Sequence, residues 1–437
     1  MKVTINKIIQ SLSKADAESL YSIYQHRCLN RQQLKKLHFD TMYPNNEVLS
    51  NRNAKKNIKA LLKFELIKEI SYRPDESVFF LTTTGIEVLR QIYSFPANIY
   101  DEQKKTSVRG YFRASELEIL PRNINHQVHL NNFVIDFMSN KGDIPIKYAD
   151  EKFMNTYTRI RPDGLFSFGD VDVFLEMDMA TEKKSQLYEK WEQYRNFINS
   201  NEYFYRERKI VVLFIVAGTH LLENRIDLVR YTIYETLLDL HDGDFEIVVG
   251  THEILQDYLL KHLVPSFKND IEYKQDIIQT LKDKHQYVWS EAIKLNKIFK
   301  NAKFDGYVRK LNEENKIYIE NNRIQEFLVD DYYFSPTDVI AKIAYIQKYN
   351  LTFKERYNRN FSYLIICESE LSILKDLKSL DLTAQPNVFY TTLERLKSLP
   401  FHEAIFQFDQ FGNVFHFENN GLTKQVFEAA LGNLDNF

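Results

Sequence analysis

The sequence contains little glycine, proline or cysteine. Its 437 residues include 12 Gly, 10 Pro and 2 Cys. The two cysteines, Cys28 and Cys367, lie far apart, so they indicate neither a disulfide framework nor a zinc cluster. No apolar run approaches the roughly 18 residues of a membrane-spanning helix, and the first residues lack the apolar core of a signal peptide. We therefore expect a cytoplasmic protein with no membrane partner.

Several catalytic motifs are also missing. The sequence has no glycine-rich phosphate loop, no nucleophile elbow and no pair of zinc-ligand spacings. Nucleotide hydrolysis and acyl transfer are therefore not expected. The chain is long enough for two to four domains, and its 44% hydrophobic and 27% charged residues are typical of a globular protein.

Positive charge is concentrated near the N-terminus. The whole chain has a net charge of −3, but residues 27–68 contain ten Lys or Arg and only three Asp or Glu. A basic module is therefore followed by an acidic body, which could receive a basic protein partner. The basic module is predicted to contain three helices, two strands around a turn at Pro74-Asp75, and a closing helix from Gly85.

The third predicted helix starts at Ser50 and carries an apolar stripe through Ala54, Ile58 and Leu61, with basic and amide side chains opposite. This order of elements resembles a winged helix-turn-helix domain, which implies double-stranded DNA as the partner. The alternative is a solvated basic face on a winged helix that binds protein. Either the first or the closing helix could form a homodimer. The resemblance assigns DNA contacts to Ser50, Asn51, Arg52, Asn53, Lys55, Lys56, Asn57, Lys59 and Arg73.

After a predicted linker, the pattern becomes that of a sheet covered by helices. A helix through NINHQVHLNNFVIDF precedes strands at IKYADEKF, at the segment after RPDG and at DVDVFLEMD. A helix at TEKKSQLYEKWEQYRNFI, the apolar strand IVVLFIVAG, another helix and the strand FEIVVGT follow. The order α-β-β-β-α-β-α-β predicts an α/β domain.

Asp163 in RPDG and Glu176 in FLEMD, followed by a helix with KWEQY, resemble the core of PD-(D/E)XK nucleases. The histidine helix upstream and the N-terminal winged helix narrow the resemblance to the replication-relaxation family of plasmid and mobile-element proteins. The resemblance covers about residues 15–255. It implies that Asp163 and Glu176 hold Mg²⁺ or Mn²⁺, because hard cations prefer carboxylate oxygen.

The sequence departs from the nuclease pattern at two positions. Asp178 occupies the place of the catalytic lysine, and His126 and His129 are the polar residues of the first helix, where a glutamate is expected. Lys184 or Lys190 on the next helix could supply the missing ammonium, and Tyr194 matches a tyrosine of that helix. Alternatively, Asp163-Gly164 is a plain turn, and the carboxylates of Asp172, Glu176 and Asp178 form a solvated edge.

The C-terminal part is predicted to repeat the central domain. Asp305-Gly306 matches Asp163-Gly164, and FLVDD, which contains Val329, matches FLEMD. KHQYVWSEAIKLNKIF is similar to the histidine helix. Val329 stands at the position of Glu176, so the metal site would be lost in this copy. The alternative is a chance alignment of two α/β units.

These patterns together predict an α/β protein (α+β overall). We expect a winged helix in residues 1–95, a linker in 96–118, a nuclease-like domain in 119–260 and a degenerate nuclease-like domain in 261–437. The expected function is DNA binding in replication initiation, mobilisation or its control on a plasmid, phage or integrative element, with weak nicking or none. The alternative is a non-catalytic transcriptional regulator whose body serves dimerisation or effector sensing.

Overall fold

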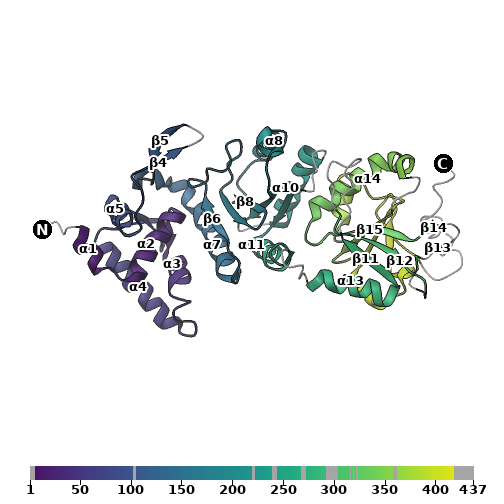
Figure 1. Cartoon of the computed structure of the whole chain (residues 1–437), viewed down its shortest axis with the longest axis horizontal. Helices are drawn as coiled ribbons and strands as arrows, with labels where there is room; N and C mark the ends of the chain where they lie inside the picture. Colours follow the sequence, from purple (N-terminus) through teal and green to yellow (C-terminus); the bar gives the residue numbers. More distant parts are fainter. Residues whose placement is uncertain are drawn as a thin grey trace. The chain divides into compact units, whose positions relative to one another are not determined.

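The computed structural model shows a mixed α/β protein, as predicted (Figure 1). The chain forms two compact units, one of Met1–Phe168 with Phe174–Met179 and one of Gly169–Val173 with Ala180–Phe437. No helix in the described part of the chain is both long and apolar enough to cross a membrane. The structure describes residues 5–101, 105–218, 222–238, 244–266, 272–291, 304–314, 316–317, 319–320, 323–357 and 362–417.

The first unit begins with helices packed on a small sheet of order β1-β3-β2. Ser13, Asn30 and Thr82 each accept a backbone N–H with the side-chain oxygen and so begin a helix. Buried leucine and isoleucine side chains from these helices and from the hairpin form one core. The elements are α1 (Ile5–Ser11), α2 (Lys14–His26), β1 (Leu29–Asn30), α3 (Arg31–His38), α4 (Glu47–Lys63), β2 (Ile67–Arg73), β3 (Glu76–Leu81) and α5 (Thr83–Ile92).

Helix α4 begins earlier than predicted. Asn46, and not Ser50, accepts the first free N–H, from Leu49 at 3.0 Å. Ser50 lies inside the helix, where it is buried and donates to Asp40 at 2.6 Å. Asparagine and serine are almost equally good N-caps, so tertiary contacts decide between them.

The range predicted as a linker contains regular structure. Strands β4 (Asn98–Asp101) and β5 (Thr106–Arg109) form an antiparallel pair (Figure 1). Helix α6 (Ala114–Leu117) follows. This hairpin is separate from the other sheets.

The central elements lie where the sequence predicts them. A five-stranded sheet has the order β10-β9-β8-β7-β6. Strands β6 and β7 are antiparallel, and β9 and β10 are parallel. The elements are η1 (Pro121–Asn123), α7 (Ile124–Asn140), β6 (Lys147–Asp150), β7 (Gly164–Phe168), β8 (Val171–Asp178), α8 (Lys184–Ile198), α9 (Asn201–Phe204), β9 (Lys209–Val216), α10 (Leu222–Leu237) and β10 (Phe245–Gly250).

The second unit continues with a seven-stranded sheet of order β11-β12-β15-β16-β17-β18-β19. Its first five strands have the same succession along the chain as β6-β7-β8-β9-β10, which supports the predicted repeat. Its elements are α11 (His252–Asp257), a π-helix (Tyr258–Leu263), α12 (Val264–Ser266), α13 (Glu272–His285), β11 (Tyr287–Glu291), β12 (Gly306–Lys310), β13 (Ile319–Glu320), β14 (Arg323–Ile324), β15 (Glu326–Asp331), α14 (Pro336–Tyr357), β16 (Ser362–Cys367), α15 (Leu374–Ser379), β17 (Val388–Thr392), α16 (Leu393–Ser398), α17 (Phe401–Ala404), β18 (Phe406–Phe408) and β19 (Val414–His416).

One helix predicted in this unit is wrong. The segment KHQYVWSEAIKLNKIF was expected to be helical, but Tyr287–Glu291 forms β11, which pairs with β12. Alternating burial, with Tyr287 buried and Val288 41% exposed, stabilises this segment as a strand. The helix that precedes β11, as α7 precedes β6, is α13. The last residues of the predicted helix, from 292 on, lie outside the described residues.

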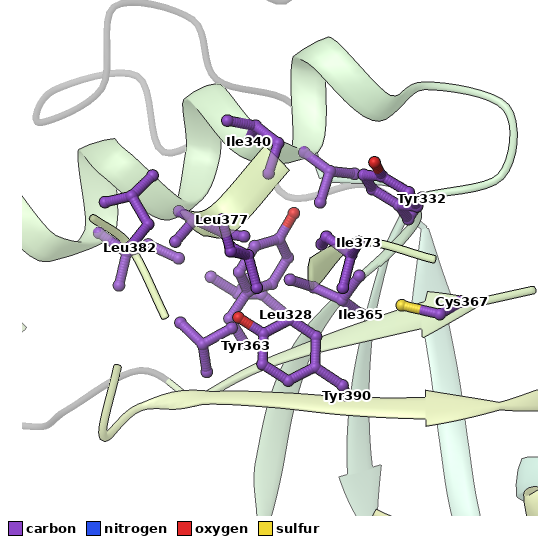
Figure 2. Packing of buried hydrophobic residues seen from close by; sticks show 14 of the residues in the cluster. Leu328, Tyr332, Ile340, Tyr363, Ile365, Cys367, Ile373, Leu377, Leu382 and Tyr390 are labelled. Atoms are coloured by element: carbon purple, nitrogen blue, oxygen red, sulfur yellow. The ribbon is translucent and has the colours of Figure 1, made fainter. Parts of the chain in front are cut away.

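The core of the second sheet is built from large side chains. Figure 2 shows Tyr363, Ile365 and Tyr390 on the sheet facing Ile340 of α14 and Leu377 of α15. All five are buried. The apolar strands predicted at FSYLIICES and VFYTTLERL are thus covered by helices, as in other α/β folds.

Gly85 lets α5 pack against the neighbouring loop. An added Cβ would lie 2.1 Å from the Leu66 carbonyl oxygen, which is a backbone atom. We predict that Gly85→Ala lowers the free energy of unfolding by about 1–3 kcal/mol, although alanine favours helices. Urea denaturation is the measurement. Thr83→Ala, at an exposed position in the same turn, is the control, and equal stability of both variants would contradict the steric explanation.

Candidate functional site

Helix α4 presents a basic stripe to solvent. Arg52, Lys55, Lys56 and Lys59 are exposed, and Lys63 extends the stripe by one turn. At 100° per residue these five positions span about a third of the helix circumference. In the described part of the chain, none of the five makes an ion pair. Other basic residues of this module are paired: Lys35 with Asp40, Lys36 with Asp136 and Lys68 with Glu118.

The other residues that were predicted to contact DNA differ in their exposure to solvent. Asn51 and Asn53 are half-buried, and Arg73 is exposed beside the turn of the β2–β3 hairpin. Ser50 and Asn57 are buried, and Asn57 donates to Asp16 at 2.6 Å. The expectation that these last two lie on the exposed face is wrong, because both hold α4 against the rest of its domain.

Asp163 connects α7 to the end of β8. Its Oδ2 accepts the Met177 N–H at 2.8 Å and lies 3.2 Å from Nε2 of His126. The same His126 nitrogen is 2.9 Å from the Met177 carbonyl oxygen. Both neighbours of Nε2 are acceptors, so this nitrogen carries the proton. The histidine helix and the Pro-Asp segment therefore meet at the strand that carries Glu176 and Asp178.

The carboxylates of β8 are buried. Asp172, Glu176 and Asp178 are 1%, 6% and 1% exposed, so the alternative of a solvated edge is wrong. Arg208 compensates Asp172, with Nε 2.9 Å from Oδ1. A strand buried along its whole length can keep carboxylates only if each has partners, since an isolated buried charge is costly.

A second polar network lies next to Asp163, and sequence reasoning missed it. Arg27 is 2.6 Å from Glu151 and 3.7 Å from Asp150. Gln127, the residue after His126, donates to Asp150 at 3.0 Å. Burial raises the pKa of Asp150 to about 6, although the Lys152 N–H and Arg27 act in the opposite direction. The sequence offered one indication of this network: the two acidic residues Asp150 and Glu151 at the end of a predicted strand.

These two networks line one cavity, the Asp163 cavity, of about 280 Å³. Its charged walls come from segments distant in sequence, including Arg27, His126, Glu151, Lys152 and Asp163. Polar groups that converge in a cavity can fix the orientation of a bound ligand. Asp163 therefore lines a cavity together with other charged groups of the first unit.

The residues can be compared with the needs of a divalent ion. Mg²⁺ often takes only one or two carboxylates and keeps several waters. Asp163 accepts the N–H of Met177, the residue after Glu176, so the segment of Asp163 adjoins the strand that carries Glu176. Within the described residues, no group of three or more His, Cys, Asp or Glu is arranged to hold a metal. A water-rich Mg²⁺ or Mn²⁺ site on Asp163 and Glu176 stays a prediction.

Three further predicted residues belong to α8. Lys184 is exposed and lies over the rings of Tyr188 and Tyr231. Lys190 is 3.3 Å from Glu182. Tyr194 is fully buried and packs against Trp191 and Phe245, so its ring is part of the core.

The second unit has a similar Asp-Gly segment, Asp305-Gly306. The cationic group near it is the ammonium of Lys342, whereas a histidine, His126, lies near Asp163. The Asp331 N–H donates to Oδ2 of Asp305 at 3.3 Å, as the Met177 N–H does to Asp163. The neighbouring Asp330 lies 3.0 Å from Nζ of Lys342 and accepts the Tyr363 hydroxyl at 2.6 Å. Lys342 also lies 2.6 Å from Asp338, one turn earlier on α14.

The charge state of Lys342 follows from its surroundings. Burial alone would lower its pKa, but the carboxylates of Asp330 and Asp338 outweigh burial and raise it. A permanent ammonium therefore neutralises the carboxylates of this site. Val329, which the sequence alignment places at the position of Glu176, is buried. The contact of Asp305 with the Asp331 N–H instead places Asp330 at the position of Glu176, because Glu176 directly precedes Met177.

Comparison with known proteins agrees with the motifs. The profile of the replication-relaxation family matches residues 20–213, a range that starts in α2 and ends in β9. The match supports the resemblance to this family and includes α4, His126, Asp163 and Glu176. Neither the search of curated proteins nor the search of solved structures returned a significant match.

Removal of the Lys342 ammonium should destabilise the second unit. Lys342→Met keeps the length of the side chain but leaves Asp330 buried without its cation, which typically costs about 3–5 kcal/mol. An unpaired buried carboxyl has a raised pKa, so the folded protein holds the proton more tightly than the unfolded chain. The loss should therefore be larger at pH 8 than at pH 5.

Urea unfolding at both pH values measures this effect. Lys348→Met, at an exposed position on the same helix, is the matched control and should change stability little. Equal unfolding curves for the two variants would show that Lys342 does not compensate the buried carboxylates.

Proposed function

We propose that this chain is a DNA-binding protein that acts in the replication or relaxation of plasmid or mobile-element DNA. The observation that carries the proposal is the exposed basic stripe of α4, whose five cations make no ion pair among the residues that the structure describes. Helices α2, α3 and α4, followed by the β2–β3 hairpin, correspond to a winged helix-turn-helix in which α4 enters the major groove and Arg73 lies on the wing. The family match supports the role in replication or relaxation.

Charge and side-chain type support contacts to both backbone and bases. Lys55, Lys56, Lys59 and Lys63 suit phosphate, because an ammonium binds it as a point charge. Arg52 can make a bidentate contact to guanine. Asn51 and Asn53 flank Arg52 and are partly accessible. That the chain forms a homodimer, and that a protein partner binds its acidic body, are still predictions.

Double-stranded DNA should lose affinity when the stripe is shortened. We predict that Lys55→Ala with Lys59→Ala weakens binding and lowers the slope of log K against log salt by about 2, since each lost phosphate contact removes about one unit. Fluorescence anisotropy with a labelled duplex between 50 and 200 mM salt measures both quantities.

Lys14→Ala is the control, because Lys14 is also exposed, lies on α2 outside the stripe and is 3.6 Å from Glu18. It should bind like wild type. Unchanged affinity and slope in the α4 double variant would remove α4 from the mechanism.

We further propose that the Asp163 site binds a divalent ion and cleaves DNA slowly or not at all. Asp163 and Glu176 would hold Mg²⁺ or Mn²⁺, and a bound ion would neutralise charge on a phosphate. Asp178 stands in place of the catalytic lysine, and Asp163 already accepts the Met177 N–H. Neither feature helps to activate water, which favours a non-catalytic DNA-binding protein or regulator over a nickase.

Calorimetry with MnCl₂ tests the ion site. We expect wild type to release heat on binding and Glu176→Gln and Asp163→Asn to lose most of that heat. Asp170→Asn, at an exposed position in the turn before β8, should behave like wild type.

A nicking assay on supercoiled plasmid with Mn²⁺ should show little product above the level of the Asp163→Asn variant. Rapid nicking by wild type that Asp163→Asn abolishes would contradict the proposed inactivity. Equal heats for all four proteins would remove the ion from the proposal and leave DNA binding untouched.

A further inference from the structure

A larger cavity of the first unit, the aromatic cavity, is not explained by duplex binding. It measures about 600 Å³ and is lined by α2, the β4–β5 hairpin, the segment after β5, and β6 with the loop that follows it. This volume lies in the range of small-molecule pockets. No residue of α4 lines it.

Aromatic rings make up much of its wall. Tyr24 meets Phe95 at 5.2 Å and Phe153 at 5.1 Å between ring centroids, and Phe112 meets Phe153 at 5.1 Å. Tyr21 also lines the cavity and stacks on Tyr93 at 4.6 Å, outside it. These rings are oriented by one another, so the wall is preorganised for a flat ligand.

The polar residues of the wall are cationic or neutral. Arg109 and Lys152 line the cavity together with the amides of Gln25 and Asn155, and no carboxylate side chain is among the described lining residues. Arg109 is partly compensated by Glu116 at 2.6 Å. Lys152 is half-buried and makes no ion pair within the described residues. The cavity therefore combines stacking surface, amides for polar edges and positive charge.

Lys152 also lines the Asp163 cavity. One ammonium group thus belongs to the walls of both cavities. An anionic group held at Lys152 would lie between the aromatic rings and the charged groups around Asp163.

We propose that the aromatic cavity binds an unpaired nucleotide, with its base on the aromatic wall and its phosphate at Lys152. Stacking on aromatic side chains contributes about 1–3 kcal/mol per base, and it suits any base. The site deepens the proposed function and rests on it: α4 holds the duplex, and the cavity receives a nucleotide that has left the duplex. The same chemistry would bind a free nucleoside monophosphate.

Fluorescence of a single-stranded oligonucleotide containing 2-aminopurine, measured with the full chain, tests the proposal. Binding should change the fluorescence. Tyr21→Ala and Lys152→Ala should each raise the Kd at least about five-fold, the lower end of the stacking range. Tyr21→Trp, which keeps a stacking surface, should bind like wild type. Affinity of all three variants for duplex should be unchanged.

The controls are matched in residue type. Tyr205→Ala removes an exposed tyrosine ring that does not line the cavity, and Lys147→Ala removes an exposed lysine of β6. Neither should alter single-strand binding. Competition with dAMP distinguishes the sources: displacement supports a site open to free nucleotides, and its absence supports a nucleotide held within a DNA strand.

Two results would overturn the proposal. One is wild type that binds duplex but neither the oligonucleotide nor dAMP. The other is single-strand binding that Tyr21→Ala and Lys152→Ala leave unchanged. Failure of the proposed function has a different signature, because duplex binding would then be insensitive to the α4 double variant while single-strand binding still responded to Tyr21 and Lys152.

Discussion

The geometry of the candidate site depends on the contacts that Asp163 makes. Its carboxylate satisfies the Met177 N–H and faces His126, and its backbone carbonyl accepts the Glu151 N–H at 3.1 Å. One residue therefore positions α7, the end of β6, the start of β7 and the end of β8. Asp163 and His126 are only half-buried, so these contacts link the elements at the margin of the covered sheet.

The two Asp-Gly segments of the chain show two ways to stabilise the same arrangement. In the first, a histidine from the preceding helix approaches Asp163, and a cavity remains beside it. In the second, Lys342 from the following helix enters the core and contacts Asp330 directly. Because the Lys342 ammonium already neutralises these carboxylates, an external cation would add little stabilisation. The first site is thus the one suited to a ligand, and the second is suited to holding its sheet together.

Much of this fold could be predicted from the sequence, because periodicity and burial are strongly coupled in an α/β sheet. The apolar strand β9 and the alternating β8 were placed correctly from their residues alone, and the resemblance directed attention to Asp163 and Glu176. Local rules failed where two signals competed. Asn46 and Ser50 are both good caps, and only the buried contact of Ser50 with Asp40 decides between them. The alternation in QYVWSE was a signal for β11 that the similarity to the histidine helix obscured.

The networks around the site could not be predicted for a different reason. Arg27 meets Glu151 across more than a hundred residues of sequence, and no spacing rule encodes such a pair. The same holds for the aromatic cavity, whose rings come from four segments of the chain. A single sequence records the residue types, but their convergence is a property of the fold.

The five basic side chains of the α4 stripe make no ion pair within the described residues, which has a kinetic consequence. A cation in a surface ion pair must leave its partner before it can bind a phosphate. The five basic groups of this stripe can bind phosphate without that step. Uncompensated charge of one sign accelerates diffusional encounter with a polyanion and permits movement along it without full release. For the proposed complex, the stripe would thus set how fast a target sequence is found, and the amides and Arg52 would set how long the protein stays there.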